Sequence, residues 1–356
     1  MNALQIVLIV LSWIFILGAI LPSFRITHWS VRNFDFIRVQ LIPIKLLILI
    51  VSLFVLDQES TLGMVTMATL LIALLYQIKI IFPYLSLFNK KKWPNAKSNT
   101  ISIISSNVLQ ENDNCDKLIA LVKEHQPDIL LTLESNAKWE KALKSIEEYY
   151  PSTKKIALEN RYGMHFYTKL KVKQLTAHFL ISEEFPSIEA HLEDSEGNDF
   201  IFWGVHPPPP SPTEEETSKK KDAELMKVAK RVAKCELPTL VIGDFNNVTW
   251  SRSSKAFAKA SNLTDPRIGY GLCSTFPVNN KLMRFPLDLL FYSDGIEINK
   301  LQRMSDIGSD HFPLHSQFTI ISEELKNSKS LSEEEKEEAE ETIKDGEEEA
   351  QEEKAS

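Results

Sequence analysis

Three long apolar runs occupy the first part of the chain, at residues 4–24, 41–56 and 62–78. The first has about 20 residues without a charge, the length that a helix needs to cross the hydrocarbon of a bilayer. A cleaved signal peptide would carry a basic N-terminal region and a small-residue cleavage site, and neither is evident. The pattern therefore predicts a membrane anchor of three transmembrane helices over residues 1–83, with the lipid bilayer as a partner.

Charged residues between the apolar runs predict how these helices are oriented. The loop between the second and third runs holds only acidic charges, and the linker predicted over residues 84–99 is basic. The loop between the first and second runs holds Arg25, Arg32 and Arg38, and Lys45 follows near the start of the second run. Because basic loops stay on the cytoplasmic side, we predict a multi-pass protein of the cell membrane whose chain after residue 90 lies in the cytoplasm.

From residue 100 the pattern changes to short β-like runs that alternate with helical ones. The β-like runs are rich in Ile, Val, Leu and Phe and are bounded by Asn, Asp, Gly or Pro. Residues 114–128 have apolar positions at helical spacing, with Asn114 as the N-cap and Pro127 beyond the end. About eight strands with three or four helices predict an α/β domain of layered architecture with a mixed sheet, over residues 100–321.

The net charge of the chain comes from its last segment. Residues 322–356 hold 15 acidic against 5 basic residues, of 48 and 40 in the whole chain, so the remainder has 33 acidic and 35 basic residues. The overall charge of −8 is therefore no argument about the substrate. The segment has too few apolar residues for a core, so we predict a disordered acidic tail, with a solvated helix as the alternative and a basic protein as a candidate partner.

Polar residues stand within or at the ends of the β-like runs, where a purely structural sheet would place apolar residues. They are Asn107, Glu134, His206, Asp244, Asn246, Asp288, Asp310 and His311. Each alone has a structural explanation, such as a strand end, a helix cap or a turn. Together they offer oxygen ligands and two imidazoles, with no cysteine among them, and this composition suits Mg²⁺ better than zinc.

The same set has the parts that phosphoester hydrolysis needs. A cation held by carboxylates neutralises charge on the phosphoryl oxygens. An imidazole beside a second acid is held in one tautomer and becomes more basic, and asparagine and histidine donate hydrogen bonds to developing negative charge. Because successive side chains diverge on an extended backbone, the adjacent Asp310 and His311 can serve the metal and the scissile phosphate, respectively.

The order of these motifs resembles the endonuclease/exonuclease/phosphatase superfamily, which has the deoxyribonuclease I-like fold. The matching pieces are SSNVL, ILLTLES, RYGMHFYTKL, WGVHPPPP, VIGDFNNVTWS, RFPLDLLFYS and GSDHFPL. With the three apolar runs and the HPPPP segment, the chain resembles a bacterial membrane-anchored branch. The resemblance implies a four-layered α/β sandwich, in which two mixed sheets are flanked by helices.

The resemblance also implies a metal site and a phosphate site. Glu134 would be the principal ligand of Mg²⁺ or Mn²⁺, with Asn107 and Asp310 assisting nearby. His206 and Tyr162 match positions that contact the phosphate in relatives.

The remaining roles follow from the same resemblance. Asp244 would orient or deprotonate the attacking water, and Asn246 would hold the phosphate. His311, oriented by Asp288, would act on the scissile phosphate or as a general base. The sequence departs from the family at Leu289, where many bacterial members have histidine.

The substrate is left open, because members of the superfamily cleave DNA, RNA, inositol phosphates and sphingolipids. The anchor favours a substrate at the bilayer, such as a lipid headgroup. The stretch 218–234 carries seven Lys and Arg residues, which either follow a nucleic-acid backbone, as in a tethered endonuclease, or form a solvated helix face. An inactive membrane scaffold is the alternative of another class, and the complete set of metal and imidazole residues favours the active hydrolase.

Overall fold

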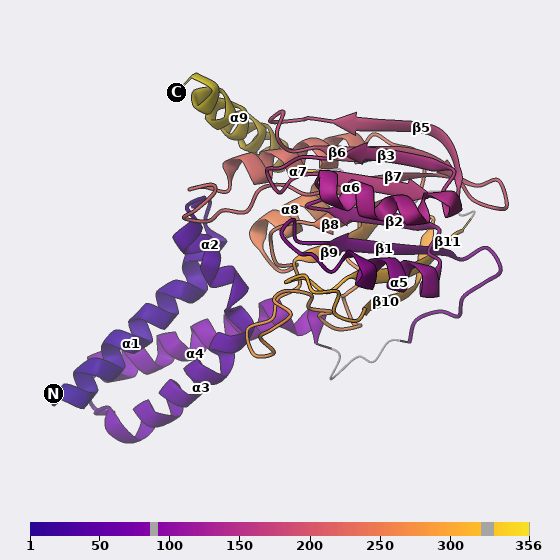
Figure 1. Cartoon of the computed structure of the whole chain (residues 1–356). Helices are drawn as coiled ribbons and strands as arrows, with labels where there is room; N and C mark the ends of the chain where they lie inside the picture. The colour runs from indigo at the N-terminus through magenta and orange to yellow at the C-terminus, as the bar shows by residue number, and fades with distance from the viewer. Residues whose placement is uncertain (86–91, 322–330, 356) are drawn as a thin grey trace.

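The computed structural model describes residues 1–85, 92–321 and 331–355, and it places a helical bundle beside a larger domain (Figure 1). The bundle consists of α1 (Ala3–Ile20), α3 (Arg38–Val55) and α4 (Thr61–Ile81), each long and apolar enough to cross a membrane. The short 3-10 helices η1 (Leu21–Ser23) and η2 (Phe82–Tyr84) extend α1 and α4. The expectation of three apolar helices is confirmed.

A short helix, α2 (Trp29–Phe36), leaves the bundle between α1 and α3 and contacts the larger domain. The backbone N–H of Trp29 donates to the carbonyl of Glu216 at 3.0 Å. The indole Nε1 of Trp250 donates to the carbonyl of Asp35 at 2.8 Å. An apolar cluster that includes Trp250, Phe36 and Ile81 continues this contact to the end of α4. The anchor and the domain are therefore packed against each other rather than joined by a linker alone.

Two mixed sheets form the centre of the domain. Among the described residues, the first sheet orders six strands as β10 (Ile296–Arg303), β11 (Leu314–Ile320), β1 (Ile101–Asn107), β2 (Ile129–Leu133), β4 (Met164–Thr168) and β3 (Ser152–Ile156). The second orders five, β5 (Lys171–His178), β6 (Ser187–Glu193), β7 (Asp199–Val205), β8 (Thr239–Asp244) and β9 (Asp288–Tyr292). The pairs β1–β2 and β7–β8 are parallel and the other strand pairs are antiparallel.

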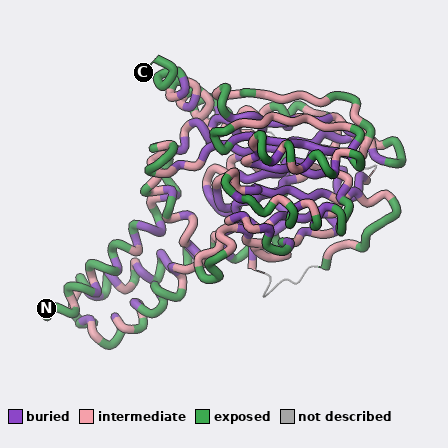
Figure 2. Tube along the Cα trace, in the orientation of Figure 1, coloured by how far each residue is buried: buried purple, intermediate pink, exposed green. Residues whose placement is uncertain are grey.

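Alternating side chains build the layers on either side of each sheet. In β1, Ile103 packs between the two sheets, whereas Ile104 packs under α5 (Cys115–His125), α6 (Ala137–Leu143) and η3 (Lys144–Tyr149). In β7, Phe202 packs between the sheets and Trp203 under α7 (Lys219–Val232) and α8 (Arg252–Ser261). The buried residues accordingly follow the strands through the middle of the domain (Figure 2). This is the expected four-layered sandwich.

The C-terminal segment differs from the expected disordered tail. Residues 333–355 form a helix, α9 (Glu333–Ala355), which lies along α7 (Figure 1). Residues 322–330 and 356 of that expected tail, and 86–91 of the expected linker, lie outside the described residues. The acidic face of α9 meets basic residues: Lys227 pairs with Glu347 at 2.6 Å, and Lys220 with Glu353 at 2.5 Å.

Small residues allow α9 to approach α7 closely. Ala339, Gly346 and Ala350 are buried, and a Cβ on Gly346 would lie 2.4 Å from the Cβ of Ala223. With Ile343 they recur at spacings of four, three and four, which is one face of a helix. The segment is too polar to build its own core, but α7 and α8 supply the partner surface that composition alone did not reveal.

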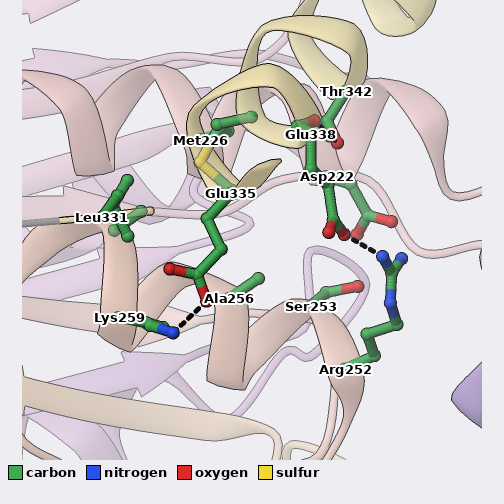
Figure 3. Close-up of a pocket in the computed structure, with 12 residues that line it drawn as sticks. Asp222, Met226, Arg252, Ser253, Ala256, Lys259, Leu331, Glu335, Glu338 and Thr342 are labelled. Atoms are coloured by element: carbon green, nitrogen blue, oxygen red, sulfur yellow. Dashed lines mark hydrogen bonds and ion pairs between the residues drawn. The ribbon is translucent and has the colours of Figure 1, made fainter. Parts of the chain in front are cut away.

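A small cavity of about 110 Å³ remains between α7, α8 and α9 (Figure 3). Two ion pairs cross it from α8 to α9, one between Arg252 and Glu338 and the other between Lys259 and Glu335. The glutamates of α9 therefore form ion pairs with basic residues of α8 as well as of α7.

Candidate active site

The ends of four strands bring the expected polar residues to one edge of the sandwich. Asn107 ends β1 and Glu134 directly follows β2, the parallel neighbour of β1. Asp244 ends β8 in the other sheet, where it lies opposite Asp288 of the antiparallel strand β9. The amide Nδ2 of Asn107 donates to Glu134 Oε1 at 2.8 Å and to Asp244 Oδ2 at 3.1 Å. The asparagine therefore bridges the two sheets between two carboxylates.

Glu134 lies in a setting that favours a bound cation. Its backbone has φ of 60°, and its Oε2 accepts from the backbone N–H of Gln110 at 3.3 Å. Burial raises the pKa of Glu134, and nearby Asp310 raises it further, against the lowering effects of His206 and of the hydrogen bond from Asn107. A cation beside these carboxylates would remove this cost of burying negative charge.

The donor set therefore fits a hard divalent cation. Carboxylate oxygens come from Glu134, Asp244 and Asp310, which line one cavity. The amide oxygen of Asn107 accepts from the backbone N–H of Leu109 at 3.0 Å, so its nitrogen faces the carboxylates. A flip of the Asn107 side-chain amide, which exchanges Oδ1 and Nδ2, would turn Oδ1 toward the carboxylates of Glu134 and Asp244.

His311 stands between two carboxylates. Its Nδ1 lies 2.8 Å from Asp288 Oδ2, and its Nε2 lies 3.6 Å from Asp244 Oδ2. Burial lowers the pKa of His311, but the carboxylates of Asp288 and Asp244 outweigh burial and raise the pKa to about 10. Ligand atoms of the three residues lie within 4.8 Å of one another. Because each ring nitrogen already faces an acceptor, the imidazole is placed as a proton donor rather than as a metal ligand.

The loop that carries His311 is fixed by a serine. The hydroxyl of Ser309 donates to the carbonyl of Asn107 at 2.8 Å and accepts from the backbone N–H of His311 at 3.1 Å. The ring of Phe276 packs at 4.7 Å from the imidazole, measured between ring centroids. The GSDH motif thus ties its histidine to the end of β1, where the carboxylates gather.

The expected phosphate-contacting residues line the other side of the site. His206 Nε2 lies 3.9 Å from Asp244 Oδ2, and its ring packs against Tyr162 with the centroids 5.3 Å apart. The hydroxyl of Tyr162 donates to Glu214 Oε2 at 2.5 Å. Asn246, with φ of 48°, donates its side-chain amide to the carbonyl of Pro207 at 3.0 Å. Hydrogen bonds within the protein position Tyr162 and Asn246, and all three side chains line the same cavity.

A cavity of about 280 Å³ joins these groups. Eight of the nine residues singled out in the sequence line it, namely Asn107, Glu134, Tyr162, His206, Asp244, Asn246, Asp310 and His311. Asp288 does not line it and lies behind His311. Leu289, the departure from the family pattern, is buried under α7 and α8 and not in the cavity.

Sequence reasoning missed several residues that also line the cavity. Asn33 and Phe36 belong to α2, the helix between the first two apolar spans, and no pattern in the sequence connects them with the site. Arg161 and Glu214 are further lining residues. Arg161 directly precedes Tyr162 in the RYG motif, so its position was a usable signal.

A family model described as "Endonuclease/Exonuclease/phosphatase family" matches residues 104–311. A comparison with curated proteins found no match.

Solved structures with a similar fold cover 62–64% of this chain. D. rerio TDP2 complexed with a single-strand DNA product has a TM-score of 0.54 and 15% identity over 62% of this chain and 100% of that chain. An endonuclease/exonuclease/phosphatase from Bacteroides vulgatus has a TM-score of 0.52 and 14% identity, over 62% and 99%. The human Nocturnin catalytic domain with a bound sulfate anion has a TM-score of 0.51 and 16% identity, over 64% and 97%. At these identities the likeness concerns the fold alone.

Proposed function

The chain belongs to the endonuclease/exonuclease/phosphatase family, and on that premise we propose that it is a membrane-anchored, divalent-metal-dependent hydrolase of phosphoester bonds. The observation that carries the proposal is the joint placement of Glu134, Asp244 and the His311–Asp288 pair at one edge of both sheets. A scaffold without catalysis would have no need for this buried set of carboxylates and imidazole.

Metal binding in this proposal rests on three residues. Glu134, assisted by Asn107 and Asp310, would hold Mg²⁺ or Mn²⁺, and the bound cation supplies charge neutralisation at the phosphoryl oxygens. The raised pKa of Glu134 supports this assignment, because a carboxylate that is costly to ionise gains most from a nearby cation.

The remaining residues act on water and phosphate. Asp244 accepts from Asn107 and from the backbone N–H of Asn246, the latter at 2.9 Å, so its carboxylate is held in place to orient or deprotonate the attacking water. His311, between Asp244 and Asp288, is oriented to donate its Nε2–H toward the scissile phosphate. In this scheme Asn246, His206 and Tyr162 would hold the other phosphate oxygens.

We propose that the substrate is a phosphoester presented at the bilayer surface. Asn33 and Phe36 of α2 line the catalytic cavity, so the anchor itself forms part of the wall that a substrate meets. In contrast, the basic helix that suggested nucleic acid is covered: Lys220, Lys227 and Lys230 of α7 pair with glutamates of α9. A nucleic-acid backbone could follow α7 only after α9 had left it.

The side of the membrane follows from the same contact. Because α2 packs against the domain, the loop between the first two spans and the catalytic domain lie on one side of the bilayer. That loop carries Arg25, Arg32 and Arg38, and basic loops remain in the cytoplasm. We therefore propose a cytoplasmic catalytic domain.

The test uses the full chain in detergent micelles, because α2 of the anchor lines the site. Hydrolysis of bis(p-nitrophenyl) phosphate, phospholipid vesicles and plasmid DNA is measured with Mg²⁺, with Mn²⁺ and with EDTA. We expect metal-dependent cleavage that falls by at least about a hundredfold in Glu134→Gln and in His311→Ala, because both act within one cooperating set.

Matched controls separate catalysis from folding. Glu124→Gln and His125→Ala change the same residue types on α5, away from the catalytic cavity, and should retain the parent rate. Rates in Glu134→Gln and His311→Ala within about twofold of the parent would contradict the site assignment. Cleavage of DNA but not of vesicles would replace the lipid-side substrate with nucleic acid.

A further inference from the structure

A second and larger cavity lies where the anchor meets the domain. This junction cavity has a volume of about 780 Å³, within the range of ligand pockets. Among the described residues it shares no lining residue with the catalytic cavity. Its walls include the ends of all three apolar spans, represented by Ser23, Arg38 and Lys79, and the facing surface of α8.

The junction cavity contains two lysines whose ammonium groups have no partner among the described residues. The side-chain ammonium groups of Lys79 in α4 and Lys255 in α8 make no hydrogen bond or ion pair with any residue that the structure describes. The other three cations of the wall are neutralised: Arg38 pairs with Asp35 at 2.7 Å, Arg252 with Glu338, and Lys259 with Glu335. Two lysines from opposite sides of the cavity therefore remain available to one anion.

The position of the junction cavity at the ends of the apolar helices indicates the source of that anion. Lys79 lies in the last turn of α4, at the end of a helix that is apolar enough to cross a membrane, and a lysine at this position reaches the headgroup level. Ile80, Pro83 and Ile268 add apolar surface to the same wall. A ligand with a phosphate for the lysines and a hydrocarbon part for these residues matches both features.

We propose that the junction cavity binds the headgroup of an anionic phospholipid, which bridges Lys79 of the anchor and Lys255 of the catalytic domain. Bound in this way, the lipid joins α4 to α8 and stabilises the packing of the domain on its anchor. The lipid site contains none of the residues assigned to hydrolysis, so this proposal does not depend on the proposed function.

The experiment measures thermal unfolding of the full chain in detergent micelles while a short-chain lipid is added. A ligand that binds only the folded state raises Tm with concentration, and the dependence gives an apparent Kd. We expect dioctanoyl phosphatidylglycerol to raise Tm and the zwitterionic dioctanoyl phosphatidylcholine to have little effect. Glycerol 3-phosphate, the soluble anion without acyl chains, should bind at least about tenfold more weakly than phosphatidylglycerol, because apolar burial is lost.

Variants test the two lysines directly. Lys79→Gln/Lys255→Gln should weaken phosphatidylglycerol binding by at least about tenfold, since two charge-assisted hydrogen bonds are lost. Lys79→Arg/Lys255→Arg keeps both charges and should retain affinity within about threefold. Lys117→Gln/Lys123→Gln removes the same charge from exposed positions of α5 and should leave binding unchanged.

Three results would overturn the proposal. The first is a phosphatidylglycerol affinity that is the same in Lys79→Gln/Lys255→Gln as in the parent. The second is an equal effect of phosphatidylcholine, which would remove the role of charge. The third is equal binding of glycerol 3-phosphate, which would identify a soluble anion in place of a lipid.

Discussion

Glu224 is a buried carboxyl group that forms no ion pair with any residue that the structure describes, although Lys227 and Arg231 lie near enough to lower its pKa. It lies on the inner face of α7 and is 1% exposed. The hydroxyl of Ser187 donates to its Oε1 at 2.8 Å, whereas Oε2 has no hydrogen-bond partner among the described residues. Burial raises the pKa of Glu224 from 4.5 to about 7, and the hydrogen bond from Ser187 offsets only part of this effect. We predict that Glu224→Gln stabilises the protein at high pH.

The sign and size of the effect follow from proton linkage. The folded state holds the proton more tightly than the unfolded state, so the contribution of Glu224 is fully present below pH 4.5 and is lost as pH rises through about 7. Each pH unit between these two values corresponds to about 1.4 kcal/mol, which gives roughly 3 kcal/mol at pH 8. Glutamine has a similar shape and never ionises, so Glu224→Gln should recover most of this free energy at pH 8 and almost none at pH 4.5.

The assay is urea unfolding of the full chain in detergent micelles, followed by tryptophan fluorescence at pH 4.5 and pH 8. The difference in the free energy of unfolding between Glu224→Gln and the parent is compared at the two pH values. The contributions of other titrating groups cancel in this comparison. Glu236→Gln changes an exposed glutamate just after α7 and serves as the control. A variant no more stable than the parent at pH 8, or equally stabilised at both pH values, would refute the reasoning.

Two further predictions concern α9 and the membrane. Gly346→Ala should displace α9 from α7, because the added Cβ would lie 2.4 Å from the Cβ of Ala223, even though alanine favours the helix itself by about 1 kcal/mol. We expect the backbone amides of α7 to exchange hydrogen faster in this variant than in the parent. Unchanged exchange would count against the close packing of the two helices. A reporter enzyme fused to the C-terminus in a bacterial host should be active in its cytoplasmic form only, and activity of a periplasmic reporter would reverse the loop-charge argument.

Three of the candidate site residues could be predicted from the sequence because of strand geometry. Asn107, Glu134 and Asp244 each stand at the end of an apolar run, and parallel strands place such ends at one edge of a sheet. The apolar runs in the sequence do not indicate how far apart the two sheets lie. The contact of Asn107 with Asp244 depends on how the sheets pack, and that packing is decided by many side chains at once.

The C-terminal segment shows where local composition misleads. Residues 333–355 have too few apolar residues to fold alone, and this inference from composition is sound. The helix α9 forms because its glutamates pair with lysines of α7 and because Gly346 packs closely against Ala223 of α7. A stripe formed by Ala339, Ile343 and Gly346 was present in the sequence, but small residues carry little hydrophobic signal.

The sequence by itself determined the three apolar spans and the layered α/β domain, and it singled out eight polar residues in or beside the strands as candidates for a site, because each of these depends on the periodicity or the ends of a single element. Only the tertiary structure decided that α2 brings Asn33 and Phe36 into the candidate site and that α9 covers α7. It also decided that a cavity lies between the anchor and the domain, where the ammonium groups of Lys79 and Lys255 have no partner among the described residues. These features are contacts between segments far apart in the chain. Their free energy comes from complementary surfaces, which no local pattern records.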